Sequence, residues 1–111
     1  MVRYSGLDRS FAALADPTRR DILEQLARGP ATISELAQPF DISLPGLMKH
    51  VRILEQAQLV RTVKQGRTRQ CQLGSEHLDG AARWIRTYQR RWERRLDRLG
   101  TYLAKQKGKA R

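Results

Sequence analysis

Residues 32–73, TISELAQPFDISLPGLMKHVRILEQAQLVRTVKQGRTRQCQL, decide the fold of this chain. Thr32 and Glu35 have the spacing of a capping box, which predicts the start of a short helix. Ser43 is a favourable N-cap and Pro45 fits the first turn of a helix, so a second helix is expected after a brief turn. The stretch therefore begins with two helices separated by a turn.

The second of these helices has two distinct faces. Its apolar residues recur at the period of an amphipathic helix, and they are Leu44, Leu47, Val51 and Leu54. The opposite side carries Pro45, Lys49, Arg52 and Gln56, with Gly46, Met48 and His50 on the flanks. We expect the apolar stripe to anchor this helix in the core and the polar side to face solvent.

A β-hairpin is expected after the second helix. Residues 59–64 and 67–73 contain many residues that favour strands, and Gln65-Gly66 between them suits a tight turn. The tip is cationic, with Lys64, Arg67 and Arg69 close together. Two helices followed by a basic hairpin are the plan of a winged helix-turn-helix, in which the hairpin is the two-stranded wing.

Two further helices are expected before this stretch. The first has its start near Ser5 and carries apolar residues at helical spacing, namely Leu7, Phe11 and Leu14. Asp16 is a suitable N-cap for the next helix and Pro17 a suitable first residue. The apolar positions of that helix are Ile22, Leu23, Leu26 and Ala27, and Gly29-Pro30 ends it.

A long helix is expected from about Glu76 to Leu103. Its apolar residues follow a near-heptad pattern: Leu78, Ala81, Ile85, Tyr88, Trp92, Leu96, Leu99 and Leu103. A domain of this size cannot easily cover so long an apolar stripe, so a second copy of the chain is the simplest partner. The predicted fold is thus mainly α, with five helices and a small β-hairpin.

The net charge of +11 is unevenly distributed. Residues 1–48 have a net charge of −1, residues 49–80 of +3 and residues 81–111 of +9. A basic middle and a more basic end favour a polyanionic partner. The alternative is that this charge serves solubility alone, and the arginines of the last helix are read mostly as a solvated face.

The length of 111 residues fits one domain with one core. We expect residues 1–103 to form a DNA-binding and dimerisation domain and residues 104–111 to be a basic, disordered tail. A single cysteine excludes an intrachain disulfide, and neither a signal peptide nor a membrane segment is recognisable. These features favour a cytoplasmic protein that does not bind membranes.

The outer face of the second helix in residues 32–73 carries the functional prediction. An α-helix fits the major groove of DNA, where base edges differ from pair to pair. Lys49 and Arg52 could reach bases or phosphates, His50 could donate to a phosphate, and Gly46 would let the backbone approach closely. The wing cations could contact phosphates or enter the minor groove. The alternative is that the cations of the helix and of the wing are only solvated surface charges. For the wing, they could also protect an edge strand from aggregation.

The chain resembles the ArsR family of bacterial winged-helix repressors. The resemblance rests on ALADPTRRDIL, SLPGLMKHVRILEQAQLV and GRTRQCQL, which have the order and spacing of that family. It implies a homodimer paired through the first and last helices, which binds a palindromic operator and usually represses. It places DNA contacts at Ser43, Pro45, Gly46, Met48, Lys49, His50, Arg52, Lys64, Arg67 and Arg69. The dimer interface it implies contains Leu7, Phe11, Leu14, Ile85, Tyr88, Trp92, Leu96, Leu99 and Leu103.

The chain departs from the family pattern at three places. Gln58 stands where many relatives have glycine, so a differently shaped helix end is expected there. The segment SELAQPFDI lacks the cysteine pair of metal-sensing relatives, and His77 and Asp79 have no second histidine to complete a ligand set. We therefore expect no metal and no cofactor. Whether a small-molecule effector exists stays open.

The remaining candidates for chemistry are weak. Cys71 is interpreted as a small core residue, with a redox switch as the alternative. Tyr88 and Trp92 are assigned to the dimer seam, while Trp84 lies off it, and an aromatic effector pocket is the alternative. No catalytic constellation is present, so we expect no enzyme. The rival functions are an RNA-binding winged-helix protein and a protein-interaction module.

Overall fold

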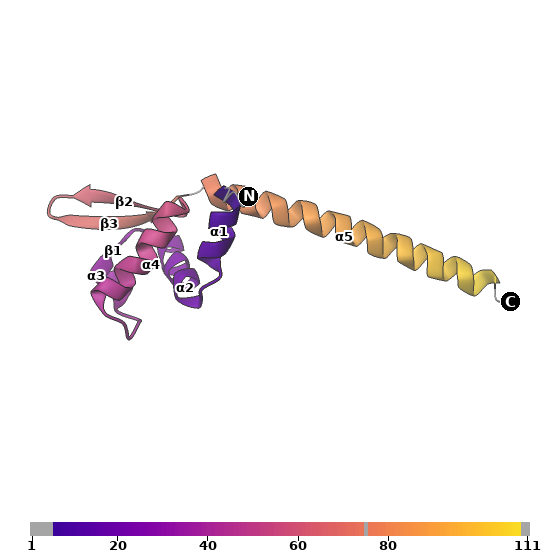
Figure 1. Ribbon diagram of the computed structural model, residues 1–111, viewed down its shortest axis with the longest axis horizontal. Helices are drawn as coiled ribbons and strands as arrows, with labels where there is room; N and C mark the ends of the chain where they lie inside the picture. Colours follow the sequence, from indigo (N-terminus) through magenta and orange to yellow (C-terminus); the bar gives the residue numbers. More distant parts are fainter. Residues whose placement is uncertain (1–5, 75, 110–111) are drawn as a thin grey trace, which may run out of the picture. The chain divides into compact units, whose positions relative to one another are not determined.

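The computed structural model describes residues 6–74 and 76–109, and these form five helices and one three-stranded sheet (Figure 1). In chain order the elements are α1 (Gly6–Leu14), α2 (Pro17–Ala27), β1 (Ala31–Thr32), α3 (Ile33–Ala37), α4 (Leu44–Gln56), β2 (Val60–Gln65), β3 (Thr68–Leu73) and α5 (Glu76–Lys109). The chain divides into a first unit that ends at Ala81 and a second that begins at Ala82. Ser5, expected near the start of the first helix, lies outside the described residues.

The three predicted helix caps are confirmed. The Asp16 carboxylate accepts a hydrogen bond of 3.0 Å from the backbone N–H of Arg19 at the start of α2. Thr32 and Glu35 form a reciprocal capping box at α3. The Ser43 hydroxyl accepts from the backbone N–H of Gly46 at α4. Each cap satisfies a backbone donor that the helix itself cannot pair.

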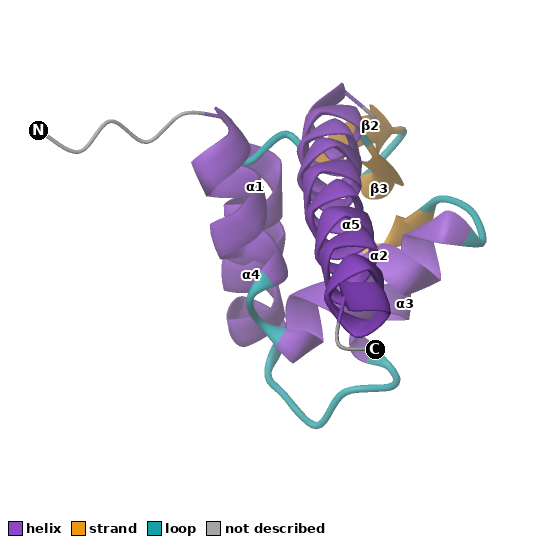
Figure 2. Ribbon diagram, turned by 90° about the vertical axis from the view of Figure 1, so that its right-hand side faces the viewer, coloured by secondary structure: helices purple, strands orange, loops and turns teal. Residues whose placement is uncertain are grey.

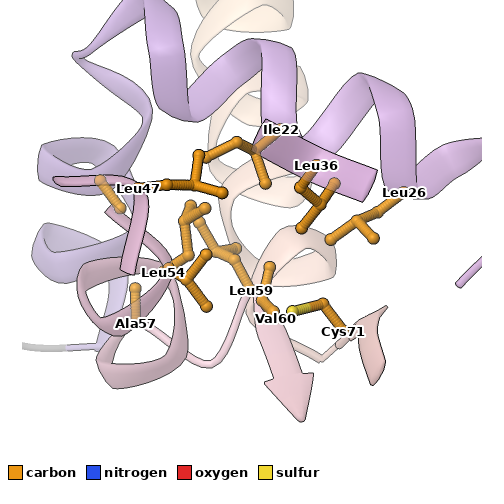
Figure 3. Packing of buried hydrophobic residues seen from close by; sticks show 11 residues of the cluster. Ile22, Leu26, Leu36, Leu47, Leu54, Ala57, Leu59, Val60 and Cys71 are labelled. Atoms are coloured by element: carbon orange, nitrogen blue, oxygen red, sulfur yellow. The ribbon is translucent and has the colours of Figure 1, made fainter. Parts of the chain in front are cut away.

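The core of the first unit joins α2, α3, α4 and the sheet. Its largest fully buried side chains are Ile22, Leu36, Leu47, Leu54, Leu59 and Cys71 (Figure 3). The predicted apolar stripe of α4 is buried at Leu47, Val51 and Leu54, but Leu44 is 49% exposed. The prediction for Leu44 was wrong because this residue is the first of α4 and lies before the part of the helix that meets the core.

Helix α1 buries small residues within its own unit. Ser10 and Ala13 are fully buried, and the Ser10 hydroxyl donates to the Gly6 carbonyl one turn earlier. The residues of the predicted apolar face, Leu7, Phe11 and Leu14, are only half-buried. The small residues allow α1 to pack closely, while its larger apolar side chains retain exposed surface.

The sheet has one strand more than the predicted wing. The strand order is β1-β3-β2, all antiparallel, and Figure 2 shows the strands in orange. Strands β2 and β3 form a hairpin that extends from helices α1 to α4 of the first unit (Figure 1). The two-residue turn is Gly66-Arg67, one position later than expected, because Gln65 pairs with Thr68 as the last rung of the ladder. Gly66 has a φ of 62°, a conformation that glycine adopts without steric cost.

The end of α4 has the shape that glycine usually provides, although the residue is Gln58. Gln58 has a φ of 59°; its N–H bonds to the Glu55 carbonyl, and the Leu59 N–H bonds to the Leu54 carbonyl. This is a Schellman motif. The expected difference in shape was therefore wrong: the chain keeps the motif and accepts the steric cost at Gln58. Gly74 packs against this turn, where a Cβ would lie 2.6 Å from the Gln58 carbonyl oxygen.

Helix α5 has 34 residues, a length of about 51 Å. It extends to Lys109, so residues 104–109, expected to belong to a disordered tail, are helical. Ala104, Lys105, Gln106 and Lys107 favour a helix, and no proline or glycine lies between Leu103 and Gly108. No helix in the described part of the chain is long and apolar enough to cross a membrane.

Candidate nucleic-acid interface

The outer face of α4 is exposed as predicted. Pro45, Lys49, Arg52 and Gln56 are exposed, while the opposite side of the helix is buried in the core. Met48 is 43% exposed, and with Pro45, Gly46, Lys49 and Arg52 it lines one shallow hollow on the outer face. The helix thus offers solvent a surface of two cations, a thioether and a first turn of low bulk.

The start of α4 is suited to an anion. Ser43 is exposed and caps the helix, and the first turn contains no acidic residue. Helix N-termini attract phosphate through unpaired N–H groups and the helix dipole. Gly46 has a structural role besides the predicted one, because a Cβ there would lie 3.2 Å from the Ser43 Oγ and would press on the cap.

The wing brings its cations to one edge of the molecule. Lys64 and Arg69 are paired directly opposite each other in the ladder, Arg67 is in the turn, and all three are exposed. Directly opposed like charges destabilise an antiparallel pair by a few tenths of a kcal/mol, up to about 1 kcal/mol. None of the three forms an ion pair with any residue that the structure describes. The wing therefore concentrates positive charge at some cost to its own stability.

Helix α4 and the wing enclose a small groove between them. Met48, Arg52 and Glu55 of α4 and Thr62 and Arg69 of the wing line a cavity of about 150 Å³, together with Ile33 and Val51. The Thr62 hydroxyl donates to the Glu55 carboxylate over 3.3 Å, which links the two elements. Arg52 and Arg69, predicted separately as contacts of helix and wing, border the same groove.

His50 does not lie on the free outer face. Its Nδ1 is 3.3 Å from a guanidinium nitrogen of Arg19 and 3.8 Å from the Asp16 carboxylate. The same Arg19 side chain donates to the carbonyls of Ala13 and Ala12, over 2.7 Å and 3.2 Å. His50 is thus engaged with its own chain through Nδ1, and a phosphate contact through the other ring nitrogen stays a prediction.

This cluster explains how α4 is held against α1 and α2. Arg19 connects the last turn of α1 to α4, and Asp16 caps α2 beside it. The hydrogen bond from the backbone N–H of Arg19 is the largest cause of the lowered pKa of Asp16. Burial opposes it, and the charges of Arg19 and His50 each lower the pKa by a smaller amount. Arg19 was missed from the sequence, because an arginine in a helix gives no local sign of which neighbouring helix it contacts.

The predicted dimer seam of α5 is exposed. Its apolar side chains are about half exposed, from 48% to 57%: Ile85, Tyr88, Trp92, Leu96, Leu99 and Leu103. Trp84 stacks on Tyr88 with ring centroids 5.4 Å apart and an interplanar angle of 7°. This stack adds a rigid aromatic surface beside the seam.

The remaining candidates are the Cys71 thiol and a metal site. Cys71 is fully buried, and burial, then the Glu55 carboxylate, raise the pKa of its thiol, which disfavours the reactive thiolate. No group of three or more potential metal ligands occurs among the described residues; the side chain of His77 lies outside them.

Comparison with known proteins identifies the family. A model described as a helix-turn-helix domain matches residues 14–63, from the end of α1 into β2. The HTH-type transcriptional regulator Rv2034 of Mycobacterium tuberculosis is 42% identical over 73 residues, 66% of this chain and 68% of that protein. A crystal structure of an ArsR family transcriptional regulator, RHA00566, is 49% identical with a TM-score of 0.75, over 80% of this chain and 98% of that one. The chain belongs to the ArsR family of transcriptional regulators.

Other matches agree with this assignment. The transcriptional repressor SdpR of Bacillus subtilis is 33% identical over 79 residues, 71% of this chain and 88% of that protein. The fold is shared with a homodimeric winged helix-turn-helix DNA-binding domain from Mycobacterium bovis, over 82% of each chain. The identity is 22% and the TM-score is 0.61. This ArsR family chain is a DNA-binding transcriptional regulator with a winged helix-turn-helix fold, and it is not an enzyme.

Proposed function

We propose that this ArsR family protein is a homodimeric repressor that binds a palindromic operator. Helix α4 would lie in the major groove, and the wing would lie on the flanking backbone or in the minor groove. The observation that carries the proposal is the division of α4 into a buried side and an outer side that bears Lys49 and Arg52. A helix anchored in this way presents a thin polar face to base edges.

The other predicted contacts fit roles around this helix. Ser43, Pro45, Gly46 and Met48 lie at its first turns, where the helix N-terminus favours a phosphate. Lys64, Arg67 and Arg69 form the basic edge of the wing, which suits phosphate contacts or insertion into the minor groove. The groove bordered by Arg52 and Arg69 would let one DNA strand meet both elements.

The dimer is supported by the apolar seam of α5. Six large side chains at helical spacing that are each about half exposed need a cover, and a second copy offers the same seam in return. Leu7, Phe11 and Leu14 of α1 would complete the interface. Two-fold symmetry would then present two copies of α4 to two half-sites of a palindrome. We infer repression because two relatives are named as repressors. We also infer that the protein acts in the cytoplasm, because that is where bacterial operator DNA is located.

Selection of bound fragments from random duplex DNA tests the operator. The expected result is one palindromic sequence with half-sites about one helical turn apart. Recovery of unrelated fragments, or stronger competition by structured RNA than by duplex DNA at equal salt, would reject sequence-specific operator binding.

Lys49→Ala and Arg52→Ala test the reading face. If the side chain contacts a base edge, we expect selectivity at one position to relax by about 1–3 kcal/mol. If the side chain contacts a phosphate, binding should weaken equally for all DNA sequences, and the slope of log K against log salt should fall by about one. Arg28→Ala is the matched control, because Arg28 is an exposed cation at the end of α2. Unchanged affinity in both α4 variants would exclude α4 as the reading helix.

Trp92→Asp tests the dimer. A carboxylate placed in an apolar interface has no partner there, so we expect monomers at concentrations where the native protein is dimeric. Thr87→Asp on the opposite side of α5 is the control and should stay dimeric. Sedimentation velocity measures both, and a dimeric Trp92→Asp protein would show that the seam is not the interface.

A further inference from the structure

The second unit carries most of the net charge of the chain. Residues 82–109 contain ten basic and two acidic side chains, a net charge of +8 of the total of +11. This segment is a single helix, drawn from orange to yellow in Figure 1. The proposed operator contacts lie in the first unit and use none of this charge.

The cations are concentrated on one side of α5. With 100° per residue, Arg83, Arg90, Arg94, Arg98 and Lys105 lie opposite the apolar seam, and all five are exposed. We call these five residues the arginine stripe. Glu93 and Asp97 lie at its edge and not within it. The stripe extends over about 33 Å, close to one turn of B-DNA.

The stripe places like charges close together along the helix, while Glu93 and Asp97, three residues after Arg90 and Arg94, offset part of the repulsion. Arg90, Arg94 and Arg98 follow one another at spacings of four, and like charges at this spacing destabilise a helix by about 0.2–0.5 kcal/mol per pair. No arginine of α5 forms an ion pair with a carboxylate in the described residues. Solubility does not require this arrangement, because acidic residues improve solubility more than added cations do.

The residue type indicates the ligand. Arginine is the cation of the stripe except at Lys105. The guanidinium group is planar and can donate two parallel hydrogen bonds to a phosphate, so it suits phosphate recognition better than a compact ammonium group does. The stripe also remains available in the proposed dimer, because it lies on the side of α5 opposite the seam.

We infer that the arginine stripe is a second DNA-binding surface, which binds phosphates of duplex DNA without reading sequence. The choice of duplex DNA as the polyanion rests on the proposed function of the first unit. The stripe adds affinity for DNA in general, while α4 and the wing select the operator. Its contribution falls steeply with salt, because each phosphate contact releases counterions.

The test uses the full-length protein and a duplex of random sequence of roughly 40 base pairs, about four helical turns. Affinity is measured over a series of salt concentrations for the native protein and R90Q/R94Q/R98Q. We expect the slope of log K against log salt to fall by about 0.9 for each lost contact, up to about 2.7 per chain, and affinity near 0.1 M salt to fall at least tenfold.

Two variants control for charge and fold. R86Q/R95Q/K107Q removes the same charge from other sides of α5 and should lose less than about threefold in affinity, because only long-range attraction is reduced. R90K/R94K/R98K keeps the charge of the stripe and should keep most of the slope. Circular dichroism and sedimentation verify helix content and assembly; the glutamine variant should fold, since it removes repulsion within α5.

The outcomes separate this inference from the proposed function. The inference about the stripe is overturned if R90Q/R94Q/R98Q has the same salt slope as the native protein. It is also overturned if both glutamine variants lose the same affinity. Neither result bears on operator selection through α4. Failure to select any operator, with the slope still dependent on the stripe, overturns the proposed function alone. Tighter binding of the native protein to anionic lipid vesicles or to structured RNA than to the duplex at equal salt would also overturn the assignment.

Discussion

Helices α4 and α5 are both amphipathic, but within the described chain α5 buries its apolar stripe only at its start, at Leu78 and Ala81. Leu47 of α4 is fully buried, whereas Leu96 of α5 is 49% exposed. Helix α4 is also fixed at its middle, where His50 contacts Arg19, and at its C-terminal end, through the turn at Gln58. The same sequence pattern therefore has two outcomes: in α4 it attaches a polar face to the core, and in α5 it leaves an apolar face exposed beyond the first turns.

Truncation of one leucine in each helix gives the largest expected contrast. Leu47→Ala should lower the free energy of unfolding by about 2–5 kcal/mol, because it leaves a cavity in a close-packed core. Leu96→Ala should act only through association, so its effect on the urea midpoint should depend on protein concentration. Equal and concentration-independent losses in both variants would remove the distinction between the two helices. Met48→Ala, on the outer face of α4, is the control and should cost little.

Local rules predicted most of α4 from the sequence. Its N-cap, its buried residues Leu47, Val51 and Leu54 and its exposed cations follow from spacing and capping, which depend on neighbours along the chain. The exposure of Leu44 did not follow, because it depends on where the helix meets the core.

Features that depend on distant parts of the chain were not predicted. Strand β1 has two residues and exists only through its pairing with β3. The contact of Arg19 with His50 joins residues 31 positions apart, and no local pattern reports it. The helical residues after Leu103 were missed for a different reason: their high charge was given more weight than their helix propensity.

The tether of α4 to α2 gives the next prediction. Asp16→Ala should lower the free energy of unfolding near neutral pH, since it removes the N-cap and the charge beside Arg19 and His50. The pKa of Asp16 is lowered in the folded protein from its ordinary value of 3.8, so its contribution is present above that value and is lost as the pH falls through the lower folded pKa. Urea unfolding at a series of pH values should show the native and variant curves converging in acid.

Asp16→Asn separates the two parts of this contribution. Asparagine keeps an oxygen that can cap α2 but carries no charge, so this variant should lie between the other two at neutral pH and should show a weaker dependence on acid. The decisive comparison is the difference in free energy of unfolding between the native protein and Asp16→Ala. If that difference is the same from neutral pH to well below pH 3.8, the charge of Asp16 does not contribute to stability.

The C-terminal end of α4 gives the smallest expected change, and it is a gain. Gln58 has a left-handed conformation that costs a side chain about 1 kcal/mol, so Gln58→Gly should stabilise the protein by about that amount or slightly less, because glycine loses more backbone entropy on folding. Gln58→Ala is the control: it removes the side chain but keeps the Cβ, and it should give no comparable gain. Equal stability of the glycine and alanine variants would mean that the turn after α4 carries no strain. A gain in the glycine variant alone would show that α4 keeps its Schellman end against a local penalty, because the core residues on either side of Gln58, Leu54 and Leu59, determine where the chain must turn.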